Sequence, residues 1–350
     1  IKFLNADGIA PPQSEAESIW KRIDEGVFDW VDSEGVLPVE HEYRTSDMHV
    51  ERVLEAVDPE AARRARFRVV LDSVNGAGCE AGSLLLQQFG CDLLHLNNEP
   101  HGRFAHTPEP VRENLDGLMA RTEAASAAVG FAQDPDADRL AIVDEQGRYI
   151  GEEYTLALCA RRILDLRGPG ALVANLSTSR MLDDVAAERE GATVHRSAVG
   201  EANVVEIMKS TQAILGGEGN GGVILPEVCW VRDSMSAMAL VLSLMAAEGR
   251  PLSAIVDDLP RYTMIKRKYD LDAIGGRDAV PPCLERARAA YASRPQSDLD
   301  GVRIELDEGW VHLRPSNTEP IMRLIAEAPD EASAARVADE AATAAGLPNA

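Results

Sequence analysis

The sequence predicts an α/β fold whose parallel-rich sheets are covered by helices, followed by a separate α+β unit. Between residues 67 and 247, short β-branched and apolar runs alternate with helical stretches, as in parallel strands joined by helices. Near Pro260 the order changes to strand, helix, strand, strand, helix. With 350 residues, 45% of them apolar, the chain is long enough for two to three domains with buried cores.

The first part of the chain differs from this pattern. Residues 1–4 are expected to form a strand that ends in a turn at 5–8. Ser14 is expected to cap a helix, and a second helix is expected near 48–57. Since no Met stands at the start, we expect the chain to begin inside a domain.

The alternating region is predicted from short apolar runs and from the turn residues between them. Residues 72–78 form a Gly-rich turn between a strand and a helix, which opens an α/β unit. The expected strands are 67–71, 92–96, 128–132, 140–143, 171–175, 193–196, 213–215, 310–313 and 321–326. Helices are expected at 81 onward, 114–128, 180–190, 202–210, 234–247 and from 330 onward.

Composition excludes several functional classes. The chain carries 58 acidic against 35 basic side chains, a net charge of −23, which argues against nucleic acid or an anionic membrane as partner. The five cysteines are odd in number and lack CxxC spacing, which indicates a reduced, cytoplasmic protein without a zinc site. No signal peptide or apolar run long enough to span a membrane is present.

The segment from Asp134 to Arg139 predicts a metal site. Side chains at i, i+2 and i+4 of an extended loop point to one side, so Asp134, Asp136 and Asp138 would repel one another without a cation. Hard oxygen ligands select Mg²⁺, Mn²⁺ or Ca²⁺ over zinc, and Arg139 beside them suits a phosphoryl group. An EF-hand is disfavoured because its sixth position, normally Gly, is Arg139. The alternative is an Asp-rich turn that binds nothing.

A second motif runs from Arg314 to Pro320, between two expected strands. Arg314, Ser316, Asn317 and Thr318 place a guanidinium, two hydroxyls and an amide within five residues. With the backbone N–H groups of a tight turn, this composition favours a phosphate cradle, and the alternative is a polar hairpin turn.

A third motif is the glycine-rich stretch 216–222. Its glycines let the backbone approach a ligand closely, while Glu218 and Asn220 present groups suited to vicinal sugar hydroxyls. A dinucleotide-binding loop is disfavoured because residues 223–225 continue as a strand rather than a helix. A purely structural turn is the other alternative.

These three loops, in this order, resemble those of the alpha-D-phosphohexomutase superfamily, whose members interconvert hexose 1- and 6-phosphates. That family's metal loop is of the type Asp-Gly-Asp-Ala-Asp-Arg, with Pro135 replacing Gly here, and its phosphate loop Arg-x-Ser-x-Thr-Glu-Pro matches 314–320. Stretches 101–104, 108–110 and 199–201 are also similar. The resemblance covers essentially the whole chain.

The resemblance implies phosphohexomutase-like three-layer α/β/α domains with mixed sheets plus a C-terminal α+β domain. The implied divisions are 1–42 (the end of a first domain and a linker), 43–151 (metal loop), 152–260 (sugar loop) and 261–350 (phosphate loop). One Mg²⁺ per chain and a hexose 1,6-bisphosphate intermediate or activator are implied. The phosphosugar would contact Glu218, Asn220, Arg314, Ser316, Asn317 and Thr318, with Arg139 supporting transfer. A monomer or homodimer is expected.

The family's phosphoserine loop, Thr-Ala-Ser-His-Asn-Pro, does not occur in this chain, so the resemblance implies that most of a first domain is missing and that the chain alone is inactive. Glu201 after Val-Gly is similar to phosphoglucosamine mutases and favours an amino sugar. Phosphomannomutase or phosphoglucomutase activity, a non-catalytic sugar-phosphate or metal-binding module, and a metal-dependent phosphatase remain as alternatives.

Overall fold

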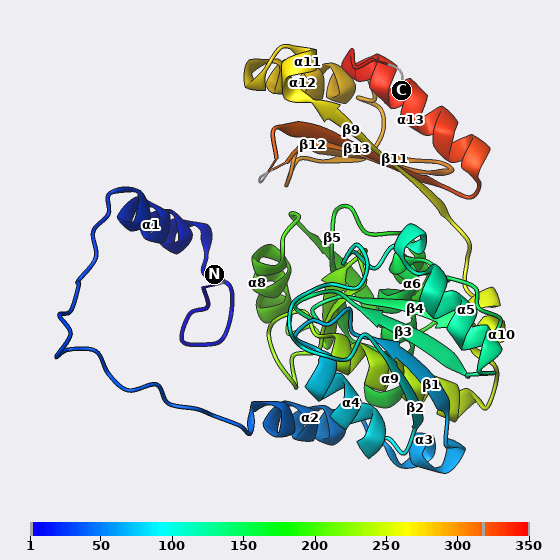
Figure 1. The fold of residues 1–350 in the computed structure, drawn as a ribbon. Coiled ribbons are helices and arrows are strands. Elements are labelled where there is room, and N and C mark those ends of the chain that lie inside the picture. Colours follow the sequence, from blue (N-terminus) through cyan, green and yellow to red (C-terminus); the bar gives the residue numbers. More distant parts are fainter. Residues whose placement is uncertain (1–2, 317–318, 349–350) are drawn as a thin grey trace.

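The computed structural model describes residues 3–316 and 319–348. Residues 3–43 extend away from the rest of the chain and carry one helix, α1 (Gln13–Asp24) (Figure 1). Ile9 of this segment is buried in a cluster with Val204, Val205 and Met208 of the helix α8 described below. Residues 1–2 of the predicted strand lie outside the described residues, and Phe3 and Leu4 are not part of a strand. The prediction that Ser14 caps a helix was wrong, because α1 begins one residue earlier, after Pro12.

The first α/β unit contains the predicted metal loop. Its four-stranded sheet has the order β2-β1-β3-β4, and only β4 is antiparallel to its neighbour. The metal loop is the hairpin between β3 and β4. The elements are α2 (Thr45–Ala56), α3 (Glu60–Ala65), β1 (Arg68–Asp72), α4 (Cys79–Gln88), β2 (Asp92–Leu96), α5 (Asp116–Ala124), β3 (Val129–Gln133) and β4 (Leu140–Asp144).

The second α/β unit repeats this topology. Its sheet has the order β6-β5-β7-β8, again with only the last strand antiparallel, and the glycine-rich motif lies in the β7–β8 hairpin. The elements are α6 (Glu152–Arg167), β5 (Ala171–Asn175), α7 (Met181–Ala187), β6 (Thr193–Ser197), α8 (Glu201–Thr211), β7 (Leu215–Glu218), β8 (Gly222–Ile224), α9 (Ser234–Glu248) and α10 (Leu252–Asp257).

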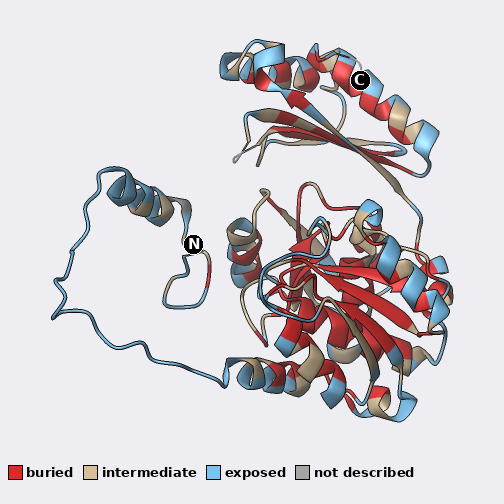
Figure 2. Ribbon diagram, in the orientation of Figure 1, coloured by how far each residue is buried: buried red, intermediate tan, exposed pale blue. Residues whose placement is uncertain are grey.

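Helices α6 and α9 join the two units into one hydrophobic core. Helix α9 packs against α6 and β8 of its own unit and against α2, α3 and α4 of the other. It is buried from Ser234 to Met245, which explains why its sequence is apolar on all sides. Figure 2 shows this buried interior and the exposed N-terminal segment.

The C-terminal unit is an antiparallel sheet of order β10-β11-β12-β13-β9 with its own core. Because side chains alternate along a strand, Val311 and Leu313 face the helices, and His312 and Arg314 face the α/β units. Its main elements are β9 (Thr263–Asp270), α11 (Leu271–Ile274), α12 (Val280–Ala290), β10 (Gln296–Ser297), β11 (Val302–Leu306), β12 (Gly309–Pro315), β13 (Ile321–Ala328) and α13 (Glu331–Ala345).

The predicted α/β class with a C-terminal α+β unit is confirmed. Strands β2 and β5 match their expected bounds, and most other boundaries move by one to four residues. Helix α6 was not predicted, and the stretch expected to be helical to residue 128 ends at Ala124. None of the helices in the described ranges is both long enough and apolar enough to cross a bilayer.

Candidate functional site

The β3–β4 hairpin brings the three predicted metal ligands together. One carboxylate oxygen from each of Asp134, Asp136 and Asp138 lies within 4.8 Å of the others. A hard cation with oxygen ligands about 2.0–2.6 Å away holds those oxygens no more than roughly 4–5 Å apart, so the donor set fits Mg²⁺ or a similar ion. The turn at 72–78 supports this loop: the Ala77 N–H donates to the Pro135 carbonyl at 2.8 Å.

Electrostatics in the metal loop also favour a cation. The pKa of Asp134 is raised to about 6, mainly by burial and also by the nearby Asp138 carboxylate, while the Arg139 hydrogen bond opposes the shift. The Arg139 Nε–H donates to Asp134 Oδ2 at 2.8 Å. Arg139 therefore orients one of the predicted metal ligands, and its contact with a phosphoryl group stays a prediction.

Arg232 connects the metal loop to the sugar loop, and no sequence motif singled it out. Its guanidinium lies 2.6 Å from Asp138 Oδ2, 2.7 Å from Glu218 Oε2 and 3.2 Å from Glu201 Oε2. Asp233 fixes the backbone beside it by capping α9. Because these partners come from three separate segments, only the folded chain reveals the cluster.

The β7–β8 hairpin explains the glycine-rich motif. The Glu218 carboxylate accepts hydrogen bonds from Asn175 Nδ2 at 2.8 Å and from the Gly200 N–H at 3.2 Å. A Cβ at Gly219 would lie 2.1 Å from Glu153 Oε1, so any larger residue there would have to displace the Glu153 side chain. The Leu140 N–H donates to the Gly221 carbonyl at 3.0 Å, which joins this hairpin directly to the metal hairpin.

The phosphate-loop motif lies in the β12–β13 turn, as expected. Arg314 is buried, and its Nε–H donates to Asp300 Oδ2 at 2.7 Å, which orients the guanidinium. The Ser316 N–H donates to the Ile321 carbonyl, and Ser316 Oγ accepts from the Glu319 N–H. Two predicted contacts, Asn317 and Thr318, lie outside the described residues.

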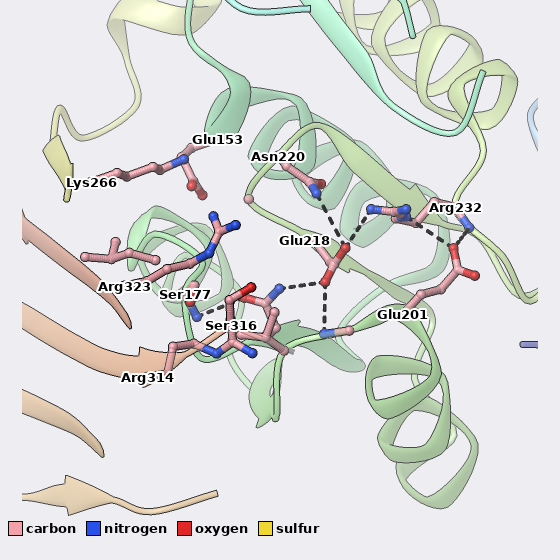
Figure 3. Close-up of a pocket in the computed structure, with 15 residues that line it drawn as sticks. Glu153, Ser177, Glu201, Glu218, Asn220, Arg232, Lys266, Arg314, Ser316 and Arg323 are labelled. Carbon is pink, nitrogen blue, oxygen red and sulfur yellow. Dashed lines mark hydrogen bonds and ion pairs between the residues drawn. The ribbon is translucent and has the colours of Figure 1, made fainter. Parts of the chain in front are cut away.

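A cleft of about 560 Å³ brings the sugar and phosphate loops together (Figure 3). Glu218 and Asn220 line it from one side, and Arg314 and Ser316 from the other. The three aspartates are not part of its lining, and Asp138 is connected to it by the ion pair with Arg232. Although the chain is acidic overall, four of the described lining residues are cationic: Arg232, Lys266, Arg314 and Arg323.

Glu153 is an unexpected member of the lining. Burial raises the pKa of its carboxyl to about 8, with smaller contributions from the Glu152 and Glu327 carboxylates, while Lys266 opposes the shift. Its Oε2 accepts from the Ser179 N–H at 2.9 Å, and Oε1 has no hydrogen-bond partner among the described residues. At neutral pH this group is therefore largely protonated.

Three family models match the chain in sequence order. They are described as Phosphoglucomutase/phosphomannomutase alpha/beta/alpha domain II at residues 47–147, alpha/beta/alpha domain III at 152–262, and C-terminal domain at 266–344. Their boundaries fall at the changes of unit seen in the fold.

Named relatives agree with these matches. A probable phosphoglucosamine mutase of Methanopyrus kandleri is 35% identical over 97% of this chain and 74% of its own length. A phosphoglucomutase/phosphomannomutase of Thermococcus kodakarensis is 39% identical over 82% of this chain and 62% of its own length. The crystal structure of a phosphoglucomutase/phosphomannomutase family protein from Burkholderia thailandensis has a TM-score of 0.80 at 26% identity, over 98% of this chain and 72% of that one. This chain thus spans 62–74% of their lengths.

Proposed function

Because this chain belongs to the phosphoglucomutase/phosphomannomutase family and is a phosphohexomutase of the alpha-D-phosphohexomutase superfamily, we propose that its cleft binds a hexose phosphate. The reaction it serves is the exchange of a phosphoryl group between O1 and O6 of the sugar, an isomerisation. The observation that carries the proposal is the convergence of the sugar loop and the phosphate loop on one cleft, with the metal loop joined to it through Arg232.

The proposed contacts follow the chemistry of the lining. Arg314 and Ser316 bind the phosphate that does not react, helped by Asn317 and Thr318, while Glu218 and Asn220 accept and donate hydrogen bonds to sugar hydroxyls. Asp134, Asp136 and Asp138 hold one Mg²⁺, with Arg139 positioning Asp134. When bound, this cation offsets negative charge on the transferring phosphoryl group.

Glucosamine phosphate is the sugar we propose. Glu201 lines the cleft with a carboxylate, which attracts an ammonium group at C2, and several relatives are named probable phosphoglucosamine mutase. Glucose or mannose phosphate is the alternative, since another relative is named phosphoglucomutase/phosphomannomutase. Calorimetric titration with glucosamine, glucose and mannose 6-phosphates decides, with Glu201→Gln as the matched variant. The proposal predicts a preference for glucosamine 6-phosphate that Glu201→Gln removes. Equal affinities would contradict the proposed specificity.

The 350-residue chain alone is proposed to bind its substrate without turning it over. No residue in it matches the phosphoserine implied by the family resemblance. A coupled assay with hexose 1-phosphate, Mg²⁺ and hexose 1,6-bisphosphate tests this, and isomerised sugar would contradict it. Release of inorganic phosphate alone would indicate a phosphatase instead. Binding without turnover from a protein that also carries the serine loop would indicate a non-catalytic module.

The proposal extends to domain boundaries, cellular compartment and oligomeric state. We propose domain divisions at 42/43, 151/152 and 260/261. Five free cysteines support a reduced compartment, and we propose the cytoplasm. We propose a monomer or a homodimer, which light scattering distinguishes.

A further inference from the structure

A serine in the cleft is hydrogen-bonded across the boundary between the second α/β unit and the C-terminal unit. Ser177 follows β5 and lines the cleft beside Ser316 (Figure 3). Its Oγ lies 2.9 Å from Nδ1 of His312, which is on β12 and completely buried. None of the three sequence motifs includes either residue.

The other ring nitrogen of His312 determines the direction of this hydrogen bond. Nε2 lies 2.6 Å from the Asp300 carbonyl oxygen, which has no hydrogen to give, so Nε2 must carry a proton. Burial lowers the pKa of His312 to about 4, aided by Arg303 and Arg314 and opposed by the Asp300 contacts. The ring is therefore neutral at physiological pH, and Nδ1 is a bare acceptor.

Ser177 consequently donates its only proton to His312. Two lone pairs of Oγ remain, and the hydroxyl can only accept hydrogen bonds from a molecule in the cleft. A nucleophilic role is disfavoured, because a buried imidazole between two arginines is a poor base. The cationic side chains Arg314, Arg323 and Lys266 are the opposite kind of partner, since they only donate.

We propose that Ser177 is a specificity-determining residue that accepts a hydrogen bond from an O–H or N–H group of the bound hexose and disfavours phosphate oxygens at that position. This inference rests on the proposed function of the cleft. It assigns the sugar ring to the space between Ser177 and Glu218, and the phosphate to the cationic side chains of the C-terminal unit. Ser177 is restricted to accepting hydrogen bonds only while His312, and therefore the C-terminal unit, is packed against the second α/β unit.

Calorimetric titration of the 350-residue chain with Mg²⁺ tests the inference. The titrants are glucosamine 6-phosphate, glucose 6-phosphate, its 2-, 3- and 4-deoxy analogues, and inorganic phosphate. Ser177→Ala should weaken the preferred hexose phosphate about 3- to 10-fold, the effect of one neutral hydrogen bond, and leave inorganic phosphate unchanged. One analogue, lacking the group that Ser177 accepts from, should bind Ser177→Ala and wild type equally. If that analogue is the 2-deoxy sugar, the ammonium or hydroxyl group at C2 is the donor to Ser177. Ser210→Ala, on an exposed face of α8, is the matched control.

Two substitutions of His312 test the direction of the bond. Gln can keep a donor near the Nε2 position but offers no acceptor near Nδ1, whereas Asn keeps an acceptor there. His312→Gln should therefore reduce discrimination between hexose phosphate and inorganic phosphate more than His312→Asn does. If these variants do not fold, Ser177→Ala alone decides. Equal loss for every titrant, or no loss, overturns the inference. Failure of the wild-type chain to bind any hexose phosphate overturns the proposed function as well.

Discussion

Replacing Arg314 with alanine removes the cation on which the proposed phosphate site depends. The side chain is 6% exposed and oriented by the Asp300 carboxylate, so its remaining N–H groups are directed without further cost in side-chain entropy. Charge-assisted hydrogen bonds to a phosphate are worth about 1.5–3 kcal/mol, which corresponds to a roughly 10- to 150-fold increase in Kd. Arg314→Lys keeps the charge but loses the bidentate geometry of the guanidinium, so its Kd should lie between those of wild type and Arg314→Ala.

Isothermal titration with glucosamine 6-phosphate measures these changes, and near-ultraviolet circular dichroism verifies that each variant is folded. Arg336→Ala is the matched control, because Arg336 is an exposed arginine on α13 paired with Glu308. Asp300→Asn should weaken binding in the wild-type background and have no further effect once Arg314 is alanine. A folded Arg314→Ala variant with a Kd within about twofold of wild type would refute the phosphate-cradle assignment.

Three further predictions follow from the geometry. Asp136 is exposed, so Asp136→Asn should fold normally yet bind Mn²⁺ at least about tenfold more weakly by calorimetry, and unchanged binding would argue against the metal site. In Gly219→Ala the new Cβ should clash with Glu153 Oε1, disturb the sugar loop and weaken hexose phosphate binding. The double variant that also carries Glu153→Ala should recover binding, and absence of recovery would contradict this packing. The pKa of Glu153, raised by burial to about 8, lies above its unfolded value near 4.3, so the folded chain keeps a proton there that the unfolded chain has released. Between about pH 4.5 and 8 this contribution to stability falls with rising pH by up to roughly 1.4 kcal/mol per unit. The Tm of Glu153→Gln should therefore rise relative to the wild-type Tm as the pH increases from 5 to 8.5. A Tm difference that stays constant over this range would contradict the raised pKa of Glu153.

The sequence was sufficient where a function or an element is encoded locally. The runs at 92–96 and 171–175 are short, apolar and flanked by turn residues, and they form β2 and β5 as expected. The metal, sugar and phosphate motifs each lie within one hairpin, so residues that are close in the sequence are also close in the structure. Residues 3–4 failed as a strand because strand formation needs a hydrogen-bonding neighbour, which composition does not specify.

The residues that join the motifs could not be found this way. Arg232 meets carboxylates 14, 31 and 94 positions away, and Ser177 meets a histidine 135 positions away. Such contacts depend on how the two α/β units and the C-terminal sheet pack, and neither an isolated Arg nor an isolated Ser carries a local signal. A weak indication existed for Arg232: an acidic chain that binds an anion must collect its cations around the site.

The central claim is that the metal loop and the cleft form one phosphosugar site. Paramagnetic relaxation of the two phosphorus nuclei of hexose 1,6-bisphosphate, measured by NMR with Mn²⁺ replacing Mg²⁺, tests it most directly. Both ions prefer oxygen ligands, and paramagnetic Mn²⁺ enhances the relaxation of nearby nuclei only. One phosphate near the aspartates and the other near Arg314 should relax unequally in the wild-type chain, and Asp136→Asn should abolish the enhancement. Equal relaxation of both phosphates, or enhancement unchanged in Asp136→Asn, would contradict a shared site.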